Sequence, residues 1–75
     1  MTLVVYSKNN CPACTKAKEL LKLKGLEFRV VNTDEDFEAF DFLISKGHRT
    51  FPQIYNEDGT LFVEGGFAGL EKYFK

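Results

Sequence analysis

Two cysteines separated by two residues constrain this chain most, because a run of helix-forming residues follows them directly. Cysteines at this spacing can form a small disulfide when the first lies at the start of a helix and the second lies one turn further along, since helical residues three apart are neighbours. Pro12 fits that arrangement, because its ring fixes φ near the helical value and a first-turn residue needs no N–H. The motif Cys11-Pro12-Ala13-Cys14 therefore predicts a helix that begins at Pro12.

Cys11 is expected to ionise more readily than a free thiol. At the start of a helix, unpaired backbone N–H groups and the helix dipole favour a negative charge. We expect the pKa of Cys11 to lie below the free-thiol value of about 8.5, in the range of about 3.5 to 7.5 that cysteines so placed adopt. Cys14, one turn further in and close to apolar Ala17, is expected to stay a thiol until it reacts.

Metal binding and a purely structural disulfide are the competing interpretations of the cysteine pair. A closed zinc or iron–sulfur site normally takes four ligands, and the one further good ligand in the sequence is His48. A structural disulfide is unusual without a secretory signal, and closing so short a loop restricts the unfolded chain little. Redox activity is therefore the favoured interpretation, with no metal.

The length of 75 residues predicts a single domain over residues 1–75, with eight phenylalanines and three tyrosines to fill a small core. The net charge of −1 gives no general attraction to nucleic acid, and no apolar run approaches the length of a membrane span. We recognise no signal peptide, so a reducing cytoplasm is expected. The protein is also expected to be a monomer.

Charge is unevenly distributed along the chain. Residues 8–29 hold six basic and two acidic side chains, a net charge of +4, whereas residues 34–41 hold five acids and no base. The basic part contains both cysteines. An anionic partner there and ordinary solvated helix faces are both compatible with this pattern.

The first third of the chain predicts a β-α-β unit. Residues 2–6 are β-branched and aromatic with little alternation, which is typical of a central strand buried on both faces. A helix over residues 12–24 places Ala17, Leu20 and Leu21 on one face, and Gly25 ends it. Residues 26–32 form the second predicted strand, for which a parallel right-handed crossover is strongly preferred.

The rest of the chain predicts a helix, a β-hairpin and a final short helix. The second helix begins with capping residues at 33–36, and an apolar stripe at helical spacing follows, which we interpret as core. A third strand at 53–55 and a fourth at 61–64 are joined by a hairpin turn at 57–60. The glycine pair at 65–66 separates the hairpin from the last helix. The apolar stripe of the second helix consists of Phe37, Phe40, Leu43 and Ile44.

The order β-α-β-α-β-β-α, with the cysteine pair in the first β-α turn, resembles the thioredoxin fold and within it the glutaredoxin family, most of all the small dithiol glutaredoxins of bacteriophages. The resemblance implies an α/β fold with a four-stranded mixed sheet flanked by three helices, and host cytoplasm if a phage encodes the chain. The tryptophan that thioredoxins carry before the first cysteine is absent. The matching segments are residues 6–8, Cys11-Pro12-Ala13-Cys14, residues 50–54, Gly65-Gly66-Phe67 and residues 70–74.

The resemblance implies thiol–disulfide exchange. The Cys11 thiolate would attack a target disulfide, and Cys14 would then attack the Cys11 sulfur and release the reduced target. Glutathione would regenerate the dithiol as co-substrate, at a potential of about −200 to −230 mV. The implied substrates are glutathione mixed disulfides and disulfide-containing proteins such as ribonucleotide reductase.

The resemblance also implies contacts with glutathione. Pro52 matches the cis-proline of the family, which lies against the cysteines, so that the backbone of Phe51 would pair with an extended substrate. Lys8 and Arg49 would meet carboxylates of glutathione, and Lys8 would also stabilise the Cys11 thiolate. The residues implied for this site are Lys8, Arg49, Phe51, Pro52, Gly65, Gly66 and Phe67.

The sequence departs from the family pattern in three places. Ala13 stands where many glutaredoxins carry an aromatic residue, and Phe51 replaces a smaller β-branched one. Residues 67–69, Phe-Ala-Gly, replace a segment that often holds an aspartate for the γ-glutamyl end of glutathione.

Two alternatives therefore stay open beside a glutathione-dependent enzyme. One is a glutaredoxin-like redoxin reduced by thioredoxin reductase, which the Gly-Phe pairing at residues 66–67 supports. The other is a dimer that holds a [2Fe–2S] cluster on two Cys11 thiolates and two glutathiones, as some relatives do.

Overall fold

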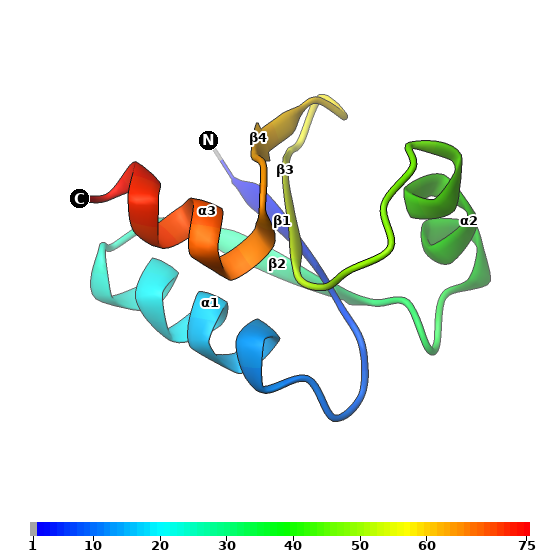
Figure 1. The fold of residues 1–75 in the computed structure, drawn as a ribbon, viewed down its shortest axis with the longest axis horizontal. Coiled ribbons are helices and arrows are strands. Elements are labelled where there is room, and N and C mark those ends of the chain that lie inside the picture. Colours follow the sequence, from blue (N-terminus) through cyan, green and yellow to red (C-terminus); the bar gives the residue numbers. More distant parts are fainter. Residues whose placement is uncertain (1) are drawn as a thin grey trace.

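The computed structural model describes residues 2–75, over which three helices flank a four-stranded sheet (Figure 1). Its longest helix has 12 residues, and within the described range no helix combines the length and the apolar character that a bilayer span requires. The elements are β1 (Leu3–Ser7), α1 (Pro12–Leu23), β2 (Phe28–Asn32), α2 (Phe37–Ser45), β3 (Gln53–Asn56), β4 (Leu61–Val63) and α3 (Gly66–Tyr73).

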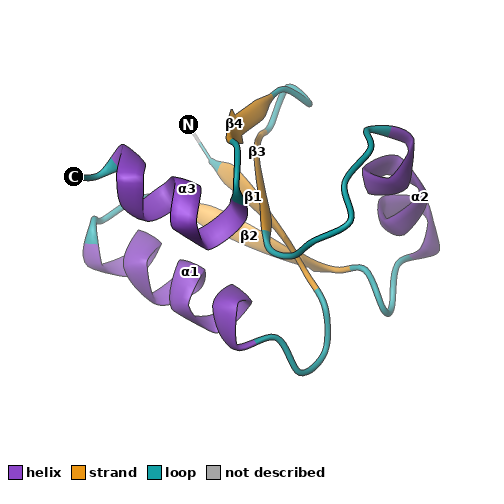
Figure 2. Ribbon diagram, viewed as in Figure 1, coloured by secondary structure: helices purple, strands orange, loops and turns teal. Residues whose placement is uncertain are grey.

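The sheet has the strand order β2-β1-β3-β4, as Figure 2 shows in orange. β1 pairs in parallel with β2, from Leu3 opposite Phe28 to Ser7 opposite Asn32. β1 also pairs antiparallel with β3, and β3 with β4. The predicted mixed sheet, the parallel β-α-β unit and the central position of β1 are therefore confirmed.

Helices α1 and α3 cover one face of the sheet (Figure 1). β1 sends alternate side chains to this face, as the period of two in a strand requires. The predicted apolar face of α1 meets them, because Ala17 and Leu21 are fully buried there and Leu20 packs beside them. The buried residues of this cluster are Leu3, Val5, Ala17, Leu21, Ile54 and Leu70.

Helix α2 covers the opposite face, where the core is smaller and more aromatic. Val4, Leu43 and Tyr55 are its buried residues, and Tyr6 and Phe42 pack against them. The rings of Tyr6, Phe42 and Tyr55 approach one another with centroids 5.2 to 5.8 Å apart. This spacing is the usual one for tilted and edge-to-face aromatic pairs.

The interpretation of the α2 stripe as core is wrong for three of its four residues. Leu43 is buried, but Phe37 is 74% exposed, Phe40 is 39% exposed and Ile44 is 51% exposed. A helix of nine residues has few positions that can face the sheet. Phe42 and Leu43 occupy that side, so the other apolar side chains point toward solvent.

The start of α2 is also later than predicted. Asp36 is the N-cap, and its carboxylate accepts a hydrogen bond of 3.1 Å from the Ala39 N–H. Thr33 and Asp34 lie in the preceding turn, where Thr33 donates to the carbonyl of Ser7 at the end of β1 and Asp34 accepts from the Asn9 N–H. The strands differ from the prediction by one or two residues at β1, β2, β3 and β4.

Candidate active site

Cys11 and Cys14 form a disulfide at the N-terminal end of α1, with their Cα atoms 5.2 Å apart. Cys11 is the N-cap and half-buried, and its Sγ accepts a hydrogen bond of 3.1 Å from the Cys14 N–H. Cys14 is 1% exposed and lies inside the first turn. Pro12 occupies the first helical position, as predicted. The two sulfurs thus differ in access: a partner can reach Cys11, whereas Cys14 is enclosed.

The loop that carries Cys11 is held against the end of β2. The Asn9 N–H donates to the Asp34 carboxylate at 2.8 Å, and the Asn32 side-chain amide donates to Asn9 Oδ1 at 2.9 Å. The Thr33 N–H donates to the Ser7 carbonyl at 2.8 Å. These bonds fix the entry into α1 from a segment more than 20 residues away in the chain, so the sequence pattern offered no sign of them.

Lys8 lies next to two other predicted site residues. Its Nζ is 5.6 Å from the ring centroid of Phe51, within the range of a cation–π contact. Lys8 also lines the same cleft as Cys11. The structure therefore brings Lys8 together with Cys11 on one side and with Phe51 on the other.

The Phe51–Pro52 peptide bond is cis, as the resemblance implies, and Pro52 is buried. The segment before Phe51 is held by Gln53, whose side-chain amide donates a hydrogen bond of 2.9 Å to the Thr50 carbonyl. Gln53 is only 4% exposed, so this bond also satisfies a buried amide. A polar residue at the start of a strand carries no distinctive pattern, so the sequence did not mark Gln53 as a site residue.

Gly66 lies against the backbone of Pro52. A Cβ at Gly66 would lie 2.7 Å from the Pro52 carbonyl oxygen, and φ is +60° there, a region that favours glycine. Gly69 is a second close approach, because a Cβ there would overlap the Glu64 carbonyl oxygen. Gly66 is among the site residues predicted from the sequence, whereas the requirement for glycine at position 69 is evident only in the structure. Gly66 thus lets the start of α3 pack beside the proline, and Gly69 lets α3 pack against the backbone of Glu64.

Arg49 and Phe67 lie apart from the Lys8 cleft. Arg49 is exposed and shares a different cleft with Gly65 and Glu64. Phe67 is half-buried and packs on the core cluster beneath α1 and α3. The structure thus divides the residues implied for glutathione between two clefts and the core.

His48 is joined to Tyr55 beneath the loop before Phe51. His48 Nε2 and the Tyr55 hydroxyl form a hydrogen bond of 2.6 Å, and their rings meet edge to face at 5.7 Å. Burial, and secondarily the nearby Tyr6 phenol, raises the pKa of Tyr55 above the ordinary value of 10.0. His48 is thus a loop residue, as interpreted from the sequence, with a specific anchoring contact that the sequence did not reveal.

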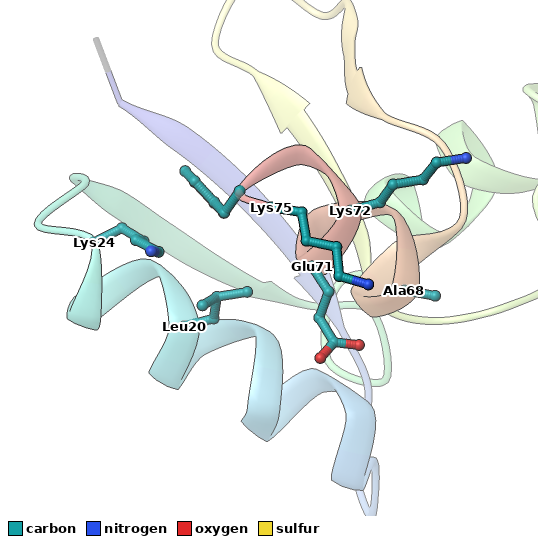
Figure 3. A pocket seen from close by; sticks show the side chains of 7 residues that line it. Leu20, Lys24, Ala68, Glu71, Lys72 and Lys75 are labelled. Carbon is teal, nitrogen blue, oxygen red and sulfur yellow. The ribbon is translucent and has the colours of Figure 1, made fainter.

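A separate cleft lies at the other end of α1 from the cysteines, between α1 and α3 (Figure 3). Lys24, Lys72 and Glu71 line it, and Lys24 Nζ lies 5.6 Å from the ring centroid of Phe74. No sulfur lies among its lining residues.

In the part of the chain that the structure describes, no three His, Cys, Asp or Glu side chains are grouped as metal ligands. The Cys11–Cys14 disulfide can transfer two electrons by exchange between its disulfide and dithiol forms.

Comparison with known proteins agrees with this geometry. The Glutaredoxin family model matches residues 3–62. The glutaredoxin-like protein NrdH of Lactococcus lactis subsp. cremoris is 37% identical over 69 residues, which are 92% of this chain and 92% of that protein. The hybrid peroxiredoxin hyPrx5 of Haemophilus influenzae is 34% identical over 73 residues. That match covers 97% of this chain but 29% of the relative, so this chain spans under a third of its length.

A solved structure of the glutaredoxin-like protein NrdH-redoxin from Escherichia coli superposes with a TM-score of 0.73. It is 29% identical, and the alignment covers 77% of this chain and 76% of the other. The fold, the cysteine pair and the family model lead to one assignment: the chain belongs to the glutaredoxin family of thiol–disulfide oxidoreductases.

Proposed function

We propose that this protein reduces disulfides in partner proteins, with Cys11 as the attacking sulfur and Cys14 as the resolving one. The observation that carries the proposal is the unequal exposure of two disulfide-bonded cysteines at the start of a helix. Cys11 is half-buried, whereas Cys14 is only 1% exposed. The Cys14 N–H that bonds to Cys11 Sγ would also stabilise a thiolate at Cys11 after reduction.

The exchange proceeds in two steps. The Cys11 thiolate attacks one sulfur of the target disulfide, so a mixed disulfide forms and the other target sulfur leaves as a thiolate that takes up a proton. The Cys14 thiol loses its proton and attacks Cys11 Sγ, which breaks the mixed disulfide and releases the second target thiol. Two electrons have passed to the target, and Cys11 and Cys14 are again joined.

Recognition of the target is assigned to the backbone of Phe51. Phe51 lies two residues before β3, beyond the last β1–β3 pair of Tyr6 with Gln53. An extended target segment can add to the sheet at this point by backbone hydrogen bonds. The Gln53 clamp on Thr50 would hold that backbone in place. Ribonucleotide reductase is the protein substrate that the resemblance implies.

The reductant that restores the dithiol has two candidates. Glutathione is the first, and the neighbourhood of Lys8, Cys11 and Phe51 supports it. Thioredoxin reductase is the second, and it is favoured because Phe67 packs on the core and Arg49 lies in another cleft. The NrdH-redoxin of Escherichia coli is described as having a thioredoxin-like activity profile, which supports the second candidate. We therefore propose thioredoxin reductase as the more effective reductant and glutathione as the weaker one.

A comparison of electron sources tests these assignments. Reduction of a protein disulfide is measured with NADPH and thioredoxin reductase, and separately with glutathione and glutathione reductase. We expect faster turnover with thioredoxin reductase. A rate at least as high with glutathione would reverse the order of the two reductants.

The two cysteines are compared in the same assays. Cys11→Ser is expected to lower the rates of both exchange activities by at least about a hundredfold, because the attacking sulfur is gone. Cys14→Ser is expected to lose protein-disulfide reduction and to keep removal of glutathione from a mixed disulfide, which needs Cys11 alone. Equal loss of both activities in Cys14→Ser would contradict the division of roles.

A further inference from the structure

A trough between α1 and β2 leads away from Cys11. Two adjoining clefts, of about 540 and 610 Å³, share Lys18 and Val30 and so form one continuous depression. We call it the α1–β2 trough. Cys11, Thr15, Lys18 and Lys22 line it from the helix side, and Val30 and Asn32 line it from the strand side.

The trough is built by the regular spacing of both elements. Residues 11, 15, 18 and 22 follow one another at steps of four, three and four, which places them in one row along α1. Val30 and Asn32 are two apart in β2, so their side chains share the α1 side of the sheet. With a rise of about 1.5 Å per residue, the row from Cys11 to Lys22 is about 16 Å long. An extended segment of about five residues matches that length.

Charge and exposure indicate what fits there. Among the described residues that line the trough, Lys8, Lys18 and Lys22 contribute ammonium groups, and Glu27 contributes a carboxylate at the far end from Cys11. The Asp34 carboxylate lies next to the Cys11 end, where it accepts the hydrogen bond from the Asn9 N–H. Val30 is 44% exposed and supplies an apolar patch between them. The whole chain has a net charge of −1, so the positive field is local to this surface.

We propose that the α1–β2 trough binds an extended acidic segment that flanks the reactive disulfide of a protein substrate. The inference rests on the proposed exchange at Cys11 and adds the substrate class that this exchange favours. A target sulfur at Cys11 places the neighbouring residues of the target at the open end of the trough. Carboxylates along that segment then meet Lys18 and Lys22, which steers the approach and sets the register. Lys18 and Lys22 themselves take no part in breaking or forming covalent bonds.

A single-turnover experiment isolates this step from the choice of reductant. The fully reduced protein is mixed with one of two oxidised peptides of equal length that carry the same internal disulfide. Glutamates flank the disulfide in one peptide, and lysines flank it in the other. The protein dithiol supplies both electrons, and the second-order rate constant is obtained from the reduced peptide formed.

We expect the wild type to reduce the acidic peptide about ten times faster than the basic one at low ionic strength, and added salt to reduce this preference. Lys18→Glu/Lys22→Glu is expected to reverse the preference. The matched control is Lys72→Glu/Lys75→Glu, which makes the same change in charge at the cleft between α1 and α3 (Figure 3) and is expected to keep it.

Equal rates for the two peptides with wild type, or the same loss of preference in both double variants, would overturn the trough as a specificity site while leaving the exchange chemistry in place. If the wild type reduces neither peptide, the proposed function itself fails, and the inference fails with it.

Discussion

The two faces of the sheet are stabilised in different ways. Under α1 and α3, six buried residues form a mainly aliphatic cluster, and the cysteine helix is part of it. Under α2, three residues are buried, and oriented contacts among Tyr6, Phe42 and Tyr55 take up much of the remaining space. Helices α1 and α3 also lie beside each other, whereas α2 lies alone on its face (Figure 1). The side that presents Cys11 is therefore the more heavily packed one.

The two parts of the site are held in place in different ways. Close packing fixes α1, so Cys11 and Cys14 are held by a rigid element. Directional bonds fix the loop before β3, through His48 with Tyr55 and Gln53 with Thr50. When a buried side chain is shortened, the single helix α2 can move to fill the space more readily than the packed pair α1 and α3 can.

The largest effect is expected for Leu21→Ala in α1. Leu21 is fully buried between two helices and the sheet, so its truncation leaves a cavity that the neighbours cannot fill. We expect the free energy of unfolding to fall by about 4 kcal/mol, near the upper part of the usual range. Urea unfolding of wild type and variant measures the difference.

Leu43→Ala makes the same truncation under α2. Leu43 is 1% exposed, but α2 has no second helix beside it and can move inward. We expect a smaller loss of about 2.5 kcal/mol, because the cost of a cavity depends on how far the site can collapse. A loss for Leu43→Ala equal to or above that for Leu21→Ala would remove the proposed difference between the faces.

Tyr55→Phe removes one hydroxyl from the aromatic face. The loss of the hydrogen bond to His48 is expected to lower stability by about 1 kcal/mol at pH 8. Because the pKa of Tyr55 is raised in the folded state, its contribution is fully present below the pH at which an unfolded tyrosine ionises, about 10, and is lost as pH rises through the raised value. The gap between wild type and variant, followed by urea unfolding from pH 8 upward, should therefore narrow above about pH 10. A stability difference between wild type and variant that stays constant with pH would contradict the raised pKa of Tyr55.

Ile44→Ala is expected to have the smallest effect, although Ile44 is next to Leu43 in α2. Half of the side chain is exposed, and alanine has the higher helix propensity, so the two effects nearly offset each other. We expect a change within about 0.5 kcal/mol by the same unfolding measurement. A loss close to that of Leu43→Ala would mean that the outer side of α2 is packed after all.

The sequence by itself determined the order of the elements, the central strand and the cysteine pair at the mouth of α1. These depend on local rules: apolar residues without alternation at residues 3–5, proline in the first helical turn, and a helical spacing of Ala17 and Leu21. The resemblance also predicts Lys8, Phe51, Pro52 and Gly66 as site residues, and the structure brings these residues into neighbouring positions.

Only the tertiary structure decided which apolar faces are covered and which distant polar groups meet. Helical spacing marks Phe37, Phe40 and Ile44 as one stripe, but whether a layer covers that stripe depends on elements elsewhere in the chain. The hydrogen bond between Asn9 and Asp34 joins residues far apart in sequence, and so does the placement of Lys18 and Val30 together in the α1–β2 trough. Periodicity reports what one segment can bury, and packing between segments determines what it does bury.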